Sequence, residues 1–204
     1  MTTTPHLKTL TLEHLPPGYE IHVAVYKNVR NAGFLQKQLL DGNEGFEYAF
    51  VDAGVVLSTT HLLSAIYRAL RDSQSGRMKS RNIHSEVVFS LSSNNNISES
   101  FRRFGITPST TNLIIVKISL PSKEVSGEEV SKHLSEVVEG ELVGFSDEVL
   151  GGLVDERRVR KVYKLGGVGG GKGGVIQSGG EREREKRELE VLVLGGMALR
   201  GFGS

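Results

Sequence analysis

Residues 112–120 of the chain read NLIIVKISL, which is the clearest strand pattern in the sequence. Its apolar residues are mostly β-branched, and Pro121 follows at once, which cannot continue a strand ladder. This combination is typical of a buried β-strand. Two more strands are predicted by apolar alternation, in IHVAVYKNV at residues 21–29 and in FEYAF at residues 46–50.

Helices are expected between these strands, where capping residues precede apolar residues at helical spacing. Asn96 with Glu99, and Ser126 with Glu129, form the capping-box pattern that opens a helix. Further helix starts are expected at Asn31, at Ser58 or Thr59, at Ser146 and at Asp155.

The short run EVVFSL at residues 86–91 is rich in β-branched residues, and we interpret it as a further strand. Strands and helices then interleave as far as residue 165. This order predicts the α/β (α+β) class: a single domain over residues 1–165, with one mixed β-sheet flanked by helices.

The end of the chain departs from this pattern. Nine of the fifteen residues from 166 to 180 are glycine, which is typical of a flexible linker. The run EREREKRELE follows, with opposite charges at helical spacing, and apolar residues begin at Leu189. We expect residues 166–187 to form a glycine-rich and charged linker. Residues 188–204 should form a tethered C-terminal helix that completes the domain or a partner interface.

The overall composition excludes several classes of protein. The formal net charge is +1, and the absence of cysteine rules out disulfides and thiolate chemistry. No apolar run approaches the roughly 18 residues that span a bilayer. Residues 1–8 lack the apolar core of a signal peptide. We therefore expect no secretion and no membrane association.

Candidate catalytic motifs are weak. Gly166, Gly171, Lys172 and Gly173 nearly match the phosphate-binding loop GxxxxGK[ST], but Gly173 stands where a hydroxyl must bind magnesium. A linker is the preferred interpretation, and a nucleotide-binding enzyme is the alternative. The histidines form no i, i+4 metal pair, and Ser85 lacks the GxSxG context of a nucleophile. We expect no metal, no cofactor and no catalytic residue.

The near-neutral total charge hides an uneven distribution. Residues 68–103 carry seven basic and three acidic side chains, whereas residues 120–156 carry two basic and ten acidic ones. One positive face would suit phosphate contacts, and a scatter of solvated charges is the plainer explanation. The residues alone leave both open.

Residues 81–106, RNIHSEVVFSLSSNNNISESFRRFGI, resemble the central signature of the TPRKB family, the PRPK-binding small regulatory subunit of the EKC/KEOPS complex. The segments FVDAGVVLSTTHLLSAIYRAL, RRVRKVYKL and MALRGF match the same family in the same order. The resemblance, to a fungal-type member, covers most of residues 20–165 and 189–202. The glycine-rich stretch is a departure from it. The matching central positions are Asn82, Ile83, Ser85, Glu86, Asn96, Ile97, Phe101, Phe104, Gly105 and Ile106.

The resemblance implies a non-catalytic subunit of a complex that installs a threonylcarbamoyl group on the adenosine next to the tRNA anticodon. It implies binding to the N-lobe of a small atypical PRPK-type kinase, and help in recruiting tRNA by its acceptor CCA end. It also implies a nuclear and cytoplasmic location and, in fungi, links to telomere maintenance and transcription. A general protein adaptor without an RNA role is a further alternative.

Carried onto this sequence, the resemblance suggests two sets of contact residues. Kinase contacts are expected on apolar helix faces, at Leu62, Ile66, Leu192, Met197, Ala198 and Leu199. Contacts with tRNA phosphates are expected at Arg71, Lys79, Arg81, Arg102 and Arg103. Asn82 and Glu86 are expected to hold the strand and its preceding loop together rather than to touch a substrate.

Overall fold

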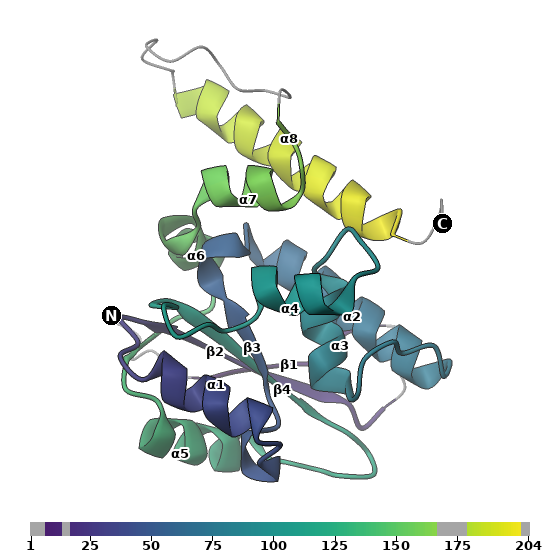
Figure 1. Cartoon of the computed structure of the whole chain (residues 1–204), viewed down its shortest axis with the longest axis vertical. Helices are drawn as coiled ribbons and strands as arrows, with labels where there is room; N and C mark the ends of the chain where they lie inside the picture. The colour runs from purple at the N-terminus through teal and green to yellow at the C-terminus, as the bar shows by residue number, and fades with distance from the viewer. Residues whose placement is uncertain (1–6, 14–16, 167–178, 201–204) are drawn as a thin grey trace.

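The computed structural model describes residues 7–13, 17–166 and 179–200 (Figure 1). Its strands are β1 (Lys8–Leu10), β2 (Glu20–Lys27), β3 (Ala49–Asp52), β4 (Leu113–Ser119) and β5 (Glu141–Val143). Its α-helices are α1 (Ala32–Leu40), α2 (Thr59–Gln74), α3 (Ile83–Ser90), α4 (Ile97–Phe104), α5 (Gly127–Val137), α6 (Asp147–Leu153), α7 (Glu156–Val162) and α8 (Gly179–Ala198). Two short 3-10 helices, η1 (Glu44–Phe46) and η2 (Ala53–Val55), flank β3.

The strands form one sheet in the order β1-β2-β4-β3, and β5 pairs with β2 as well. The predicted strand at residues 112–120 is confirmed as β4, in the middle of this sheet, with Val23 of β2 opposite Val116. Every pairing among the described strands is antiparallel. The α/β class with a single domain is confirmed, but the expectation of a mixed sheet is wrong.

The sheet separates two apolar layers, because alternate residues of each strand point to opposite faces. Val23, Val116 and Val51 belong to the core that packs against α2, α3 and α8, whereas Ala24 and Ile115 face α1 and α5. Figure 1 shows α1 and α5 on one side of the sheet and α2 with α3 on the other. The molecule therefore has three layers, with the sheet buried between helices.

Most of the helix starts predicted from capping residues agree with the structure. The side chains of Ser58, Asn96, Ser126 and Ser146 each accept a backbone N–H at the start of a helix. The capping box at Ser126 has both of its reciprocal hydrogen bonds. Asn31 precedes α1, as predicted, but its side chain donates to the Val137 carbonyl at 2.8 Å instead of capping the helix.

The run EVVFSL at residues 86–91 is not a strand but most of helix α3. The side chain of Asn82 accepts the Ser85 N–H at 2.8 Å and starts the helix. Seven of the eight residues of α3 are buried, so the helix has no exposed face to contrast with a buried one. Its sequence therefore lacks the apolar periodicity of an amphipathic helix, and its β-branched residues suggest a strand.

The C-terminal helix α8 begins at Gly179, so the charged run that we assigned to a linker is helical from that point. The predicted linker residues 167–178 and the tail residues 201–204 lie outside the described residues, as do His6 and His14. None of the helices in the described ranges is both long and apolar enough to cross a membrane.

Candidate functional site

Helix α8 lies on the layer formed by α2 and α7 (Figure 1). Leu189, Val193 and Met197, spaced one turn apart, point into the main core and are at most 4% exposed. Gly196 also faces inward, because a Cβ there would lie 3.5 Å from the Cβ of Ser93. The inward stripe fixes the rotation of α8 about its own axis.

The opposite stripe of α8 is open to solvent. Val191 and Leu199 are 68% and 67% exposed, and Gly195 between them has no atom within 4 Å of an added Cβ. Val191 and Leu192 line a shallow depression with Arg187 and Glu188. We call Val191, Leu192, Gly195, Ala198 and Leu199 the outward face of α8.

This arrangement corrects part of the predicted kinase-contact set. Leu62 and Ile66 are 0% exposed and Met197 is 4% exposed, so these side chains pack inside the domain and cannot contact a docked partner. Ala198 and Leu199 are exposed, and Leu192 is half-buried. Val191, which is not in the predicted set, carries the largest exposed fraction on the helix among the large apolar side chains.

The carboxyl end of α8 is tied to α2 and α3 by arginines. Arg68 on α2 donates to the carbonyls of Met197 and Arg200, the second at 3.2 Å. Arg200 itself is only 6% exposed, donates to the Phe89 carbonyl, and lies with its guanidinium carbon 4.0 Å from the centre of the Phe89 ring. Burial lowers the pKa of Arg200 to about 10, which leaves it charged at neutral pH.

A second set of contacts holds the helices beneath α8. Arg158 on α7 donates to the buried carboxylate of Asp52 at 2.6 Å, and the other oxygen of Asp52 accepts the Gly54 N–H. Asp155 N–H also donates to the Gly54 carbonyl. The end of β3 therefore fixes α7, and α7 with α2 supports α8.

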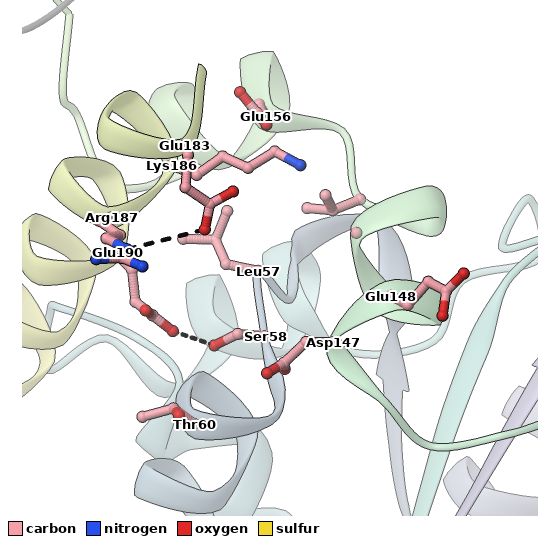
Figure 2. Close-up of a pocket in the computed structure, with 12 residues that line it drawn as sticks. Leu57, Ser58, Thr60, Asp147, Glu148, Glu156, Glu183, Lys186, Arg187 and Glu190 are labelled. Atoms are coloured by element: carbon pink, nitrogen blue, oxygen red, sulfur yellow. Dashed lines mark hydrogen bonds and ion pairs between the residues drawn. The ribbon is translucent and has the colours of Figure 1, made fainter. Parts of the chain in front are cut away.

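A cleft of about 380 Å³ lies between α8, α6 and the start of α2. Figure 2 shows Glu190 reaching from α8 to Ser58, and dashed lines join Ser58 to Glu190 and Glu183 to Arg187. The lining is rich in carboxylates. Within the described ranges, no group of three or more His, Cys, Asp or Glu is arranged to hold a metal ion.

A groove of about 510 Å³ lies on another part of the surface, between α1 with η1 and the first turn of α3. Its apolar lining includes Leu39, Phe46 and Phe101. Its charged lining consists of two cations, Arg81 and Lys123, and two carboxylates, Glu44 and Glu47. Lys123 reaches the rim from the loop between β4 and α5, and its ammonium lies 3.5 Å from Glu47. Lys123 was not among the predicted contacts.

The five predicted tRNA-contact residues lie on three segments: the end of α2, the loop of residues 75–82 and helix α4. Lys79 and Arg81 are exposed on the loop of residues 75–82, which we call the basic loop, and Arg71 is exposed near the end of α2. Arg102 is exposed on α4 and donates to Glu99 at 2.9 Å. Arg103 is half-buried and donates to the Val162 carbonyl of α7 at 2.8 Å, so part of its hydrogen-bonding capacity is used within the fold.

Glu86 and Asn82 hold the basic loop to α3, as expected in part, although the element is a helix. One oxygen of the buried Glu86 accepts from the backbone N–H groups of Lys79 and Ser80, at 3.0 and 2.8 Å, and from the Ser80 hydroxyl at 2.6 Å. Asn82 caps the same helix. The three hydrogen bonds to Glu86 and the cap at Asn82 therefore fix the end of the basic loop to α3.

The chain has relatives along nearly its full length. The family described as kinase binding protein CGI-121 matches residues 26–201. The EKC/KEOPS complex subunit cgi121 of Aspergillus fumigatus is 49% identical over 195 residues, covering 96% of this chain and 97% of that protein. The subunit of the same name from Coccidioides immitis is 43% identical, with 96% and 98% covered. That of Schizosaccharomyces pombe is 42% identical, with 73% and 84% covered.

Proposed function

This chain belongs to the CGI-121 family of kinase-binding proteins, and we propose that it is a non-catalytic EKC/KEOPS subunit that binds a small atypical PRPK-type kinase through the outward face of α8. In this proposal the chain also helps to recruit tRNA for threonylcarbamoyl modification. Its relatives carry the name of the same complex, and two of them match 96% of the chain, which includes both the sheet and α8.

The observation that carries the kinase proposal is the asymmetry of α8. Its inward stripe is fully packed and its end is held by Arg68, yet Val191 and Leu199 remain about two-thirds exposed eight residues apart. Gly195 leaves space between them for a closely approaching side chain or backbone. A rigid helix with an apolar outer stripe is the form in which helices are commonly recognised by a groove on a partner.

The tRNA proposal rests on the groove beside the basic loop. Arg81 and Lys123 stand on its rim, and Phe46 and Phe101 contribute aromatic side chains to its lining. Cations near aromatic side chains are the usual elements that bind unpaired nucleotides. The groove therefore suits the single-stranded acceptor end of tRNA, with phosphates on the basic side chains.

The kinase proposal is tested by mixing the full chain with the kinase subunit and measuring the mass of the complex by light scattering after size exclusion. Val191→Glu with Leu199→Glu should weaken the complex by about 30-fold or more, because two carboxylates would have to be buried in an apolar contact. Both side chains are exposed, so the fold should be retained.

Phe34→Glu with Leu40→Glu is the matched control for this experiment. These side chains are 47% and 76% exposed on α1, on the other side of the sheet from α8. The control variant should bind the kinase as the natural chain does. Equal binding by both double variants would remove α8 from the interface.

The tRNA proposal is tested by the salt dependence of affinity. Arg81→Gln with Lys123→Gln should reduce the slope of log affinity against log salt by about 0.7–0.9 for each lost phosphate contact. Lys132→Gln, an exposed lysine on α5, is the control and should leave the slope as it is. A slope that is the same in all three proteins would contradict the proposed contacts.

A further inference from the structure

The carboxyl end of α8 is held from outside the helix, by a side chain of α2. The last carbonyls of a helix have no partner within the helix and need donors from elsewhere. Arg68 provides two, because its Nη1 and Nη2 donate to the carbonyls of Met197 and Arg200, the second at 3.2 Å. Its third nitrogen, Nε, lies 3.8 Å from Oδ2 of Asp72, one turn further along α2. Each nitrogen of this guanidinium therefore faces either α8 or Asp72.

Asp72 has a second cationic neighbour, which comes from the basic loop. Nε of Arg77 lies 3.6 Å from Oδ1 of Asp72, whereas Arg68 is paired with Oδ2. The Arg77 N–H also donates to the Asp72 carbonyl at 2.8 Å, which holds the loop beside the end of α2. The side chain of Asp72 is 18% exposed and that of Arg77 is 68% exposed. One half-buried carboxylate therefore lies between the cation that holds α8 and a cation that is open to solvent.

The charges of Asp72 and Arg77 act on Arg68 with opposite signs. Asp72 attracts the guanidinium of Arg68, and Arg77 offsets part of this attraction, because the two arginines repel each other across the same carboxylate. A phosphate group bound to Arg77 would neutralise its charge, so that the full attraction of Asp72 would act on Arg68. Water and dissolved salt screen charges at partly exposed side chains, so each effect is small. Its sign follows from the arrangement of the three side chains.

We propose that Asp72 is a positioning residue that couples the binding of a phosphate group at Arg77 to the docking of the carboxyl end of α8. The ligand class is a polyanion that carries phosphodiester groups. A phosphate on Arg77 strengthens the hold of Arg68 on α8. By reciprocity, whatever tightens the end of α8 favours phosphate binding at Arg77 to the same extent.

The inference rests on the proposed function for the roles of the two segments, since there the basic loop borders the tRNA groove and α8 presents the kinase surface. In that setting, tRNA that engages the loop makes α8 a firmer docking element for the kinase. The coupling between the segments can be measured without any partner. Its failure is therefore distinct from failure of kinase or tRNA binding.

The test is amide hydrogen exchange on the full chain, with the amides of β4 as the reference. Exchange is read at Leu199 and Arg200, whose N–H groups donate to carbonyls of α8 at 3.0 and 3.2 Å. Asp72→Asn should raise exchange at these two amides by about two- to fivefold, because Arg68 loses its anionic neighbour. Arg77→Gln should lower exchange there by about twofold, because the repulsion on Arg68 is removed. Loss of a merely structural contact would raise exchange in both variants.

A double-mutant cycle and a matched control complete this experiment. In the Asp72→Asn background Arg77→Gln should no longer lower exchange, because no carboxylate then holds Arg77 beside Arg68. Glu141→Gln removes a carboxylate from an exposed ion pair between β5 and β2, with Lys27 at 3.0 Å, and should leave the end of α8 unchanged. The proposal is overturned if Asp72→Asn has no effect or if Arg77→Gln fails to lower exchange. It is equally overturned if Arg77→Gln has the same effect in both backgrounds.

A second experiment tests the ligand, with a short single-stranded RNA oligonucleotide as the probe. Saturating RNA should lower exchange at Leu199 and Arg200 in the natural chain, and this effect should be absent in Arg77→Gln and in Asp72→Asn. RNA that binds without slowing these amides would overturn the coupling and leave the tRNA proposal standing. If the RNA does not bind, the tRNA proposal and the ligand assigned to Arg77 both fail, whereas the variants still decide whether Asp72 couples the two segments.

Discussion

Lowering the pH from 7 to 5 should destabilise this chain by about 4 kcal/mol, because two buried histidines must take up protons on unfolding. Nδ1 of His61 accepts the Leu57 N–H at 3.2 Å, and its Nε2 lies 2.8 Å from the hydroxyl of Tyr163. Nε2 of His84 accepts the Ile118 N–H at 3.0 Å. Each ring is therefore held in its neutral form by a backbone donor.

The magnitude follows from the pKa values of these rings. Burial lowers the pKa of His61 and of His84 to about 3 from the usual 6.5, with smaller contributions from lysines near His84. A lowered folded-state pKa gives stability that is present above pH 6.5 and is lost as the pH falls toward 3. A pH of 5 lies about 1.5 units below the pKa of the histidines in the unfolded chain. Their protonation therefore lowers the free energy of unfolding by about 2 kcal/mol for each ring. The total is a large part of the stability of an ordinary domain.

The assay is urea denaturation of the full chain at both pH values, with the free energy of unfolding extrapolated to water. His61→Gln and His84→Gln, made singly, should each remove about half of the difference between pH 7 and pH 5, whatever their stability at pH 7. If the natural chain and both variants lose the same free energy between the two pH values, the histidines are not its source.

Three further predictions concern packing, an ion pair and a helix cap. Met197→Ala should lower the free energy of unfolding by about 2–3 kcal/mol, because the side chain is buried in the core. Val191→Ala, on the exposed face of the same helix, should change it by less than about 0.5 kcal/mol, and urea denaturation measures both variants. Asp52→Asn weakens the 2.6 Å contact with Arg158 and should cost about 1–3 kcal/mol, with faster amide exchange in α7; unchanged exchange in α7 would contradict this anchoring role. Ser126→Ala removes the cap of α5 and should cost about 1 kcal/mol in thermal or urea unfolding.

Those elements of the fold could be predicted whose secondary structure is determined by a few neighbouring residues in the sequence. Residues 113–119 form a strand because their composition suits a buried strand whatever their neighbours are. Ser126 and Glu129 start a helix because the capping box is complete within four residues. Helix α3 could not be predicted in this way, because its start depends on Asn82 and its burial on all sides removes the periodicity that marks a helix.

The candidate site was less predictable, because it depends on which side of each helix the domain covers. The i, i+4, i+8 series that begins at Leu189 is buried, whereas Val191 and Leu199, the two ends of the series that begins at Val191, are exposed. Both series look apolar in the sequence, and only the docking of α8 distinguishes them. The apolar side chain of Leu62 packs in the core of the domain and is not available to a partner. Lys123 lines the groove from a loop that is distant in the sequence from the other lining residues, so sequence spacing alone could not predict its position there.

The most direct test of the central claim is side-chain footprinting with hydroxyl radicals, on the chain alone and bound to the kinase subunit. If the outward face of α8 is the contact, the labelling of Val191 and Leu199 should fall strongly on binding. Labelling of Phe34 and Leu40, exposed on the other side of the sheet, should stay as it is. A stable complex in which Val191 and Leu199 remain fully labelled would contradict the account.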